Sequence, residues 1–386
     1  MKVFTGARLF DGKELVDDHA LIVEGATIRA LVELKDRPRD GEQVDLGGGI
    51  LAPGFVDWQI NGGGGVLFNA EPTVEGIARI AAAHRREGVT GFLPTVVTDA
   101  PEVLAAALSA ARVAHVRVPG ALGIHVEGPF IDPRRKGVHP PEWIRPMREK
   151  DAEALIAMRA GAMVVTLAPA SVPLEMIAKL ARSGIIVSLG HSEATAEEAE
   201  AVFDAGARAV THLYNAMSPL SSRAPGVVGA TLSDPRVVCG LIADGEHAHP
   251  AAYRAAIAAK GPQGIALISD AMPPAAGGPD VFELQGRRMT RVGRKLVDET
   301  GRLAGAAITM RDAVRYVALT LGLPLAHALT MATLTPARLL GVDDRIGRLA
   351  PGCHADLVHL TDALDVVKVW VGGLAMDESG APGEAA

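Results

Sequence analysis

Two histidines each follow a short apolar run, and their spacing predicts a shared site. His191 follows the run 185–189, and His212 follows the run 208–210. A helix-like segment lies between the runs, so the pattern is strand, helix, strand, with both imidazoles at the same ends of neighbouring parallel strands. In a closed parallel barrel, active sites are built at those ends. The two histidines therefore predict part of a metal site.

A carboxylate at the end of another predicted strand completes a ligand set. Glu127 closes the apolar run 122–127. One carboxylate and two imidazoles can bind a catalytic Zn²⁺ or Fe²⁺ and leave a coordination position open for water. Each histidine alone could be a hydrogen-bonded core residue, but three ligand types at three strand ends favour one divalent metal ion, with Zn²⁺ as the first expectation.

Two further polar residues follow predicted strands and could handle protons. Asp270 follows the run 265–269. It could take a proton from a water activated by the metal and pass it to a leaving group, or it could cap the loop that follows. His247 follows the run 238–242 and could polarise a carbonyl, whereas we expect His249 at the start of the next helix.

The elements that must position these residues alternate between apolar strands and Ala-rich helices from 53 to 349, which predicts a (β/α)8 TIM-type barrel. Thr195 and Glu198 form a predicted capping box at one helix start. The stretch 281–303 departs from the alternation and predicts a hairpin excursion. Eight runs predict the barrel strands: Gly54–Asp57, Thr90–Leu93, Leu122–Glu127, Val164–Leu167, Ile185–Leu189, Arg208–His212, Val238–Ile242 and Ile265–Ser269.

The two ends of the chain share a different pattern of short strands and turns. This pattern covers 1–52 and returns at 350–386. Because both ends are β-rich and flank a different middle, we expect them to form one small β-sandwich domain.

Composition restricts the classes of partner and compartment. The chain has 386 residues, 48% of them hydrophobic, and a net charge of −7, which argues against a nucleic-acid surface. Its two cysteines suggest neither a disulfide framework nor a thiolate zinc site. No signal peptide or membrane span is evident, so we expect a cytoplasmic protein without a membrane partner.

Several motifs along the chain can be compared with known families. They are Ala52-Pro-Gly-Phe-Val-Asp57, His125-x-Glu127-Gly-Pro, Lys136-Gly-Val-His139, His212-Leu-Tyr-Asn-Ala-Met217 and Ala243-Asp-Gly-x-His247. Together these motifs resemble one family, the N-acetylglucosamine-6-phosphate deacetylases of the amidohydrolase superfamily, and the similarity runs through nearly the full chain. The resemblance implies hydrolysis of the acetamide of a small sugar phosphate to D-glucosamine 6-phosphate and acetate, one divalent metal ion per subunit, and a homodimer.

The resemblance also implies roles for individual residues. Glu127, His191 and His212 would hold the metal. Asp270 would act as general base and then as acid, and His247 would orient the acetamido carbonyl and contact the sugar. Arg223 would meet the phosphate, with help from a neighbouring subunit as one option. The other implied substrate contacts are Val138, His139, Asn215, Ala216, Leu303, Ala304, Gly305 and Ala306.

One departure from the superfamily pattern concerns a second metal. Many amidohydrolases carry His-x-His after the first barrel strand, but here those positions are Gln59 and Asn61. Neutral amides bind transition metals poorly, so we expect a single metal. The basic run Arg134-Arg135-Lys136 is expected to be solvated in a loop, and Arg223 is the better phosphate ligand because a guanidinium binds phosphate bidentately.

Three other functions are alternatives, and the sequence does not favour them equally. N-acetylgalactosamine 6-phosphate differs from the glucosamine substrate by the orientation of one hydroxyl and stays open, because the residues that read this hydroxyl are not identifiable. A cyclic-amide hydrolase is less favoured, because it would usually want the His-x-His pair and a bridging lysine, and neither is evident. The intact metal ligands and Asp270 argue against a non-catalytic sugar-phosphate-binding protein, which would not need a water-activating base.

Overall fold

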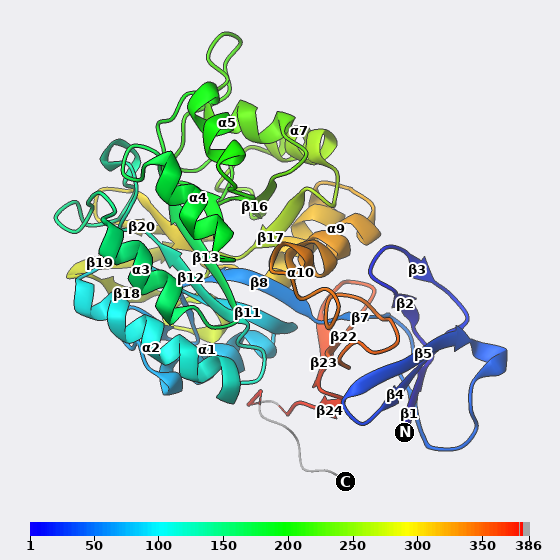
Figure 1. The fold of residues 1–386 in the computed structure, drawn as a ribbon. Helices are drawn as coiled ribbons and strands as arrows, with labels where there is room; N and C mark the ends of the chain where they lie inside the picture. Colours follow the sequence, from blue (N-terminus) through cyan, green and yellow to red (C-terminus); the bar gives the residue numbers. More distant parts are fainter. Residues whose placement is uncertain (378, 381–386) are drawn as a thin grey trace.

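Eight parallel strands form the centre of the computed structural model, which describes residues 1–377 and 379–380 (Figure 1). Their order is β17-β16-β15-β14-β13-β12-β11-β8, and a parallel bridge between Ile60 and Ala271 joins the two outer strands. The predicted eight-stranded barrel is therefore confirmed. The strands are β8 (Phe55–Ile60), β11 (Val89–Val97), β12 (Gly123–Glu127), β13 (Ala162–Leu167), β14 (Ile186–Leu189), β15 (Ala209–Val210), β16 (Val238–Ile242) and β17 (Ile265–Ile268).

Helices follow the barrel strands and each buries one apolar side. In α5, Thr195 and Glu198 form the predicted capping box, and the buried residues Ala199, Val202 and Phe203 recur at helical spacing. None of the described helices is long and apolar enough to cross a membrane. The helices are α1 (Val74–Arg85), α2 (Pro101–Arg117), α3 (Glu149–Met158), α4 (Leu174–Arg182), α5 (Ala196–Asp204), α6 (Gly226–Ser233), α7 (Pro250–Lys260), α8 (Met310–Arg315), α9 (Leu325–Ala332) and α10 (Leu334–Leu339).

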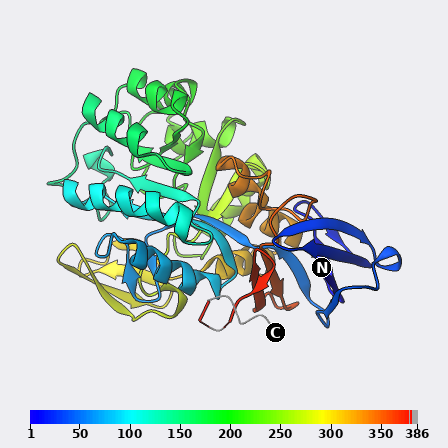
Figure 2. The same cartoon turned by 60° about the horizontal axis from the view of Figure 1, so that its bottom comes forward.

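Both ends of the described chain build the predicted β-sandwich, with blue and red strands side by side in Figures 1 and 2. One sheet has the order β5-β4-β1-β6 and the other β24-β23-β22-β7-β2-β3. Between them lies an apolar core that includes Phe4, Leu21 and Trp370. The strands are β1 (Lys2–Thr5), β2 (Arg8–Phe10), β3 (Leu15–Val16), β4 (His19–Glu24), β5 (Thr27–Glu33), β6 (Glu42–Asp45), β7 (Ile50–Pro53), β22 (Leu357–Leu360), β23 (Val366–Val371) and β24 (Leu374–Ala375).

The domain limits at 52/53 and 349/350 stay a prediction. Strand β7 crosses the first limit: it pairs with β2 and β22 of the sandwich and leads directly into β8 of the barrel. Residues 378 and 381–386 of the predicted second segment lie outside the described residues.

The predicted excursion after β17 is a four-stranded antiparallel sheet at the end of the molecule opposite the β-sandwich (Figure 2). Its own apolar core includes Leu284, Met289 and Leu296. The last strand is anchored beside the barrel, because Ala306 N–H donates to the carbonyl of Asp270 over 2.9 Å. The strands are β18 (Val281–Leu284), β19 (Arg287–Val292), β20 (Lys295–Asp298) and β21 (Leu303–Ala306); a small hairpin, β9 (Gly62–Gly63) with β10 (Val66–Leu67), follows β8.

Candidate active site

Glu127, His191 and His212 meet at the carboxyl ends of the barrel strands. Glu127 is the last residue of β12, and the two histidines lie just beyond β14 and β15. Glu127 Oε1 lies 3.2 Å from His191 Nε2 and 3.0 Å from His212 Nε2, and the two Nε2 atoms are 3.1 Å apart. All three side chains are buried. The structure thus brings together the three residues that the sequence put forward as metal ligands.

The hydrogen bonding of His191 shows that this cluster suits a cation. Its Nδ1 lies 2.8 Å from the carbonyl oxygen of Arg135, which can only accept, so Nδ1 carries a hydrogen. In the neutral ring, Nε2 then presents a lone pair toward Glu127 and His212. Nδ1 of His212 is buried and has no hydrogen-bond partner among the described residues, so no contact behind that ring fixes its tautomer. A cation at this place, or a hydrogen on His212 Nε2, would satisfy the lone pairs of His191 and Glu127. A backbone carbonyl behind the ring is also the usual support of a metal-binding histidine.

The pKa values of Glu127 and His212 are shifted by their contact with each other. Burial alone would raise the pKa of Glu127, but the two imidazoles beside it hold the pKa well below its usual value. Burial alone would lower the pKa of His212, but the Glu127 carboxylate raises the pKa above its usual value. The carboxylate is therefore charged and available to a cation.

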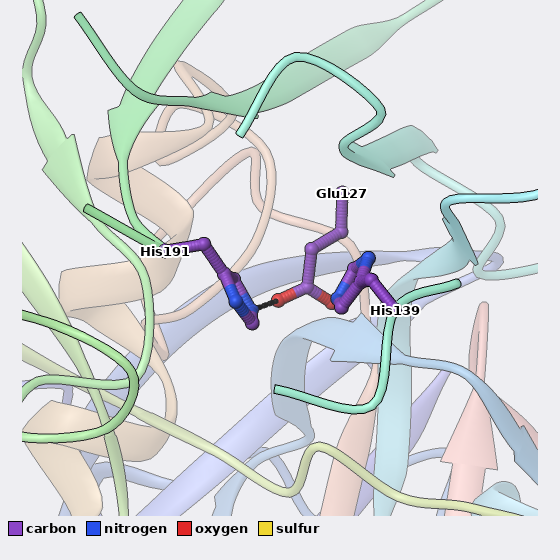
Figure 3. Close-up of side chains that lie close together, drawn as sticks. All are labelled: Glu127, His139 and His191. Carbon is purple, nitrogen blue, oxygen red and sulfur yellow. Dashed lines mark hydrogen bonds and ion pairs between the residues drawn. The ribbon is translucent and has the colours of Figure 1, made fainter. Parts of the chain in front are cut away.

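His139 is a fourth potential donor at this place. Figure 3 shows the Glu127 carboxylate between the rings of His191 and His139, and one donor atom from each of the three lies within 4.8 Å of the others. The rings of His139 and His191 pack edge to face, with centroids 4.5 Å apart. Because His139 Nδ1 is 2.7 Å from the Thr98 hydroxyl, only its Nε2 is free for another partner.

Gln59 and Asn61 hold the two carboxylates of the site. Gln59 Nε2 donates to Glu127 Oε2 over 3.2 Å and to Asp270 Oδ1 over 3.1 Å. Asn61 Nδ2 donates to the same oxygen of Asp270 over 2.6 Å. Gln59 and Asn61 stand where many amidohydrolases have the His-x-His pair. Their side-chain amides donate hydrogen bonds to the carboxylates of Glu127 and Asp270 instead of binding a metal.

Asp270 has the environment of a general base. It is buried, and burial followed by the nearby charge of Glu127 raises its pKa to about 6, against the opposing influence of His212. A base with a pKa near the working pH can both take up and release a proton. This environment fits the expected sequence of base and then acid.

A second carboxylate orients His247. Asp244 Oδ2 lies 2.7 Å from His247 Nδ1, and Asp244 Oδ1 accepts the backbone N–H groups of Glu246 and His247. Tyr253 also donates to Oδ1, over 3.3 Å. The imidazole is thus fixed with Nδ1 turned to the carboxylate. The predicted helix start at His249 is confirmed, since its side chain caps α7.

The cluster opens into a cavity of about 380 Å³. Its lining includes nine residues that the sequence put forward: Glu127, Val138, His139, His191, His212, Asn215, Ala216, His247 and Asp270. Leu303 and Gly305 of β21 also line the cavity, whereas Ala304 and Ala306, the other two residues of this strand, are buried and do not.

Arg223 is not among the lining residues of this cavity. It lies in the exposed stretch 220–224 before α6. Within one chain the structure therefore does not bring Arg223 to the cluster, and its contact with phosphate stays a prediction. Arg134 and Arg135, expected to be only solvated, instead lie at the cavity edge.

Sequence reasoning gave no chemical role to four residues of this site. Gln59 and Asn61 were recognised only as poor ligands, although their place after the first strand could have indicated carboxylate donors. The motif that carries His247 also contained its support, Asp244. Arg302 lines the cavity directly before the 303–306 loop, and only that adjacency could have drawn attention to it.

The backbone is strained where the site is built. His191, His212 and Asp270 have φ values of +47°, +36° and +48°, and Ala216 has +51°. Residues with a Cβ rarely adopt this left-handed region, and they cluster at functional sites when they do. These four residues lie just beyond the ends of β14, β15 and β17, and all four line the cavity.

A closed parallel barrel with a buried acid and imidazole cluster at its carboxyl face defines a barrel hydrolase. Comparison with known proteins agrees: residues 50–376 match the amidohydrolase family, and residues 1–51 match the NagA composite domain. The chain belongs to the amidohydrolase family.

Its relatives within that family are sugar-phosphate deacetylases. An N-acetylgalactosamine-6-phosphate deacetylase of a Shewanella species is 40% identical, covering 97% of this chain and 95% of the relative. The human N-acetylglucosamine-6-phosphate deacetylase is 39% identical, covering 96% and 94%. The crystal structure of N-acetylglucosamine-6-phosphate deacetylase from Pasteurella multocida is 34% identical, with a TM-score of 0.93 over 96% of this chain and 98% of that chain.

Proposed function

We propose that this protein hydrolyses the acetamide of N-acetyl-D-glucosamine 6-phosphate and releases D-glucosamine 6-phosphate and acetate. One observation carries the proposal: Asp270, with a pKa raised to about 6, shares a cavity with the cluster of Glu127, His191 and His212. A binding protein has no need of a buried base beside a cation site. The names of the relatives supply the substrate class.

We assign Glu127, His191 and His212 as ligands of one divalent metal ion, with Zn²⁺ as the first expectation and Fe²⁺ as the alternative. The donor set fits such an ion because its lone pairs converge and one histidine is supported by the Arg135 carbonyl. When bound, the metal would polarise the acetamide carbonyl and lower the pKa of a water molecule.

The residues of the chain would then move the proton and hold the substrate. Asp270 would accept the proton of the attacking water and return it to the departing amine. Asn61 and Gln59 would keep the Asp270 carboxylate in place through their hydrogen bonds. His247, held by Asp244, would orient the acetamido carbonyl from the wall of the cavity.

We further propose a homodimer in which Arg223 of one subunit meets the phosphate in the other. The exposed position of Arg223 outside its own cavity supports this arrangement.

Acetate release from N-acetylglucosamine 6-phosphate by the purified protein, with metal analysis of the same sample, tests the proposal. We expect one equivalent of divalent metal per chain and stoichiometric acetate and amino-sugar phosphate. A protein that binds the sugar phosphate but releases no acetate with any of Zn²⁺, Fe²⁺ or Mn²⁺ would be a binding module instead.

N-acetylgalactosamine 6-phosphate is the second candidate substrate, because the Shewanella enzyme that acts on it is 40% identical to this chain. The two epimers should be compared in the same assay. If kcat/KM is higher for N-acetylgalactosamine 6-phosphate, that sugar is the preferred substrate, and the proposed reaction stays the same.

A further inference from the structure

Three arginines lie at the edge of the cavity, and one of them forms no ion pair at contact distance among the described residues. Arg134 forms an ion pair with Asp132, and Arg135 forms one with Glu193. Arg302, directly before β21, forms no ion pair with a described residue. In a chain with a net charge of −7, an unpaired guanidinium beside a catalytic cavity is available to an anionic ligand.

Arg302 is held in place by the loop that borders the cavity. Its Nη1 donates to the carbonyl of Gly137 over 3.2 Å, and Arg287 of β19 donates to the next carbonyl, that of Val138. A guanidinium has five N–H donors in a fixed fork, so one bond to a carbonyl leaves others free. The arginine is thus oriented without being neutralised.

Other groups on this loop add to the positive potential. Lys136 forms no ion pair with a described residue, and burial, followed by Arg302 and Arg287, lowers its pKa. The backbone N–H groups of Gly137 and Val138 donate to no other described residue. Glu142 and Asp298 are the acids that oppose this potential, and Asp298 already accepts from Thr300 and from the Arg302 backbone.

The loop also adjoins the metal cluster. A Cβ placed on Gly137 would lie 3.3 Å from Cε1 of His191, and Arg135 contributes the carbonyl that holds His191. The cavity therefore has acids at its floor, Glu127 and Asp270, and an unpaired cation at its edge. This polarity fits a short molecule with an amide at one end and a dianion at the other.

We propose that Arg302, assisted by the free N–H groups of Gly137 and Val138, binds the substrate's phosphate within the same chain. This inference rests on the proposed function and adds a specificity-determining cation to it. Arg287 is a positioning residue, because it acts on the phosphate only through the loop.

Steady-state kinetics of Arg302→Gln tests the inference, with the metal-loaded protein and two sugars, N-acetylglucosamine 6-phosphate and N-acetylglucosamine. We expect kcat/KM on the phosphorylated sugar to fall about 10- to 100-fold, as for loss of a charge-assisted contact, mainly through KM. The activity on the sugar without phosphate should stay unchanged. The inhibition constant of inorganic phosphate should rise by a similar factor and gives a readout independent of turnover on the neutral sugar.

Two further variants separate phosphate binding from loop shape. Arg288→Gln, on the neighbouring exposed position of β19, is the matched control and should change neither constant. Arg287→Gln should lower activity on both sugars alike, because it releases the Val138 carbonyl.

Two results would overturn the inference: an unchanged phosphate inhibition constant in Arg302→Gln, or an equal loss on both sugars. Either result leaves the proposed function intact, whereas a wild-type protein that deacetylates neither sugar phosphate epimer would contradict the proposed function itself.

Discussion

Asp244 Oδ2 lies 2.7 Å from Nδ1 of His247, and both side chains are buried at the wall of the cavity. This contact fixes which nitrogen of the imidazole is free to face the cavity. The same carboxylate accepts two backbone N–H groups and the Tyr253 hydroxyl, so it cannot turn away. Contacts within the loop after β16 therefore fix the orientation of His247 before any ligand binds.

Asp244→Asn should lower kcat about 10- to 100-fold, since loss of a hydrogen bond to a charged group costs roughly 1.5–3 kcal/mol and misorients the ring. Metal content should not change. Tyr253→Phe, which removes only one of the donors to Asp244, is the control and should show a smaller effect.

Asp270→Asn should lower kcat by at least about 10²-fold, because an amide cannot take the proton from water. The variant should keep its metal, since Asp270 lies outside the proposed ligand set, and it should still bind the sugar phosphate. Stopped-time acetate assays and metal analysis on one preparation would measure both. Near-normal turnover would show that another group acts as the base.

The third metal ligand can be decided between His212 and His139. His212→Gln should reduce bound metal well below one equivalent per chain, because Nε2 of His212 lies 3.0 Å from the shared Glu127 oxygen. His139→Gln should keep the metal and raise KM, because we place His139 at the substrate. Equilibrium dialysis against Zn²⁺ would measure both variants; metal loss only in the His139 variant would reverse the assignment.

Asp57 should make stability depend on pH. It is fully buried, accepts from Ser269 and the Gln59 backbone, and burial raises its pKa from 3.8 to about 7. Between about pH 4 and 7 the folded protein keeps a proton that the unfolded chain has lost. The stabilisation is therefore full below about pH 4, is lost as pH rises to about 7, and does not change further.

Asp57→Asn should flatten this dependence, by about 4 kcal/mol at most across the interval. The measurement is the free energy of unfolding in urea at several pH values for both proteins. Because Asp270 contributes a shift of the same sign, only the difference between the proteins reports on Asp57. Parallel curves for the two proteins would contradict the assignment.

Mixed dimers should test the proposed role of Arg223. Arg223→Gln and Asp270→Asn should each be poorly active as homodimers. In a mixed dimer, one site would combine the intact Asp270 of one chain with the intact Arg223 of the other, so co-expression should restore up to about half of the wild-type activity per mixed dimer. No recovery in purified mixed dimers would mean that Arg223 does not act across subunits.

Much of the fold and of the metal cluster could be predicted because the signals are local. Each barrel strand is an apolar run followed by a helix start, and Glu127, His191, His212 and Asp270 stand at or just beyond run ends. Parallel strands bring such ends to one face whatever the intervening sequence is.

The remaining features depend on contacts that no local pattern encodes. Arg302 meets Gly137 across 165 positions of the chain, through a sheet whose docking the sequence does not specify. Gln59 reaches Asp270 across 211 positions. The contact of Arg223 with phosphate stays a prediction, because the place of this side chain depends on how the loop before α6 is oriented.

The left-handed backbone at His191, His212 and Asp270 has a consequence for the stability of the barrel. Glycine would adopt these three conformations without strain, whereas the side chains present cost roughly 1–3 kcal/mol each. The packing and hydrogen bonds of the remaining barrel must offset this cost at three strand ends. The site therefore lowers the net stability of the fold that positions it.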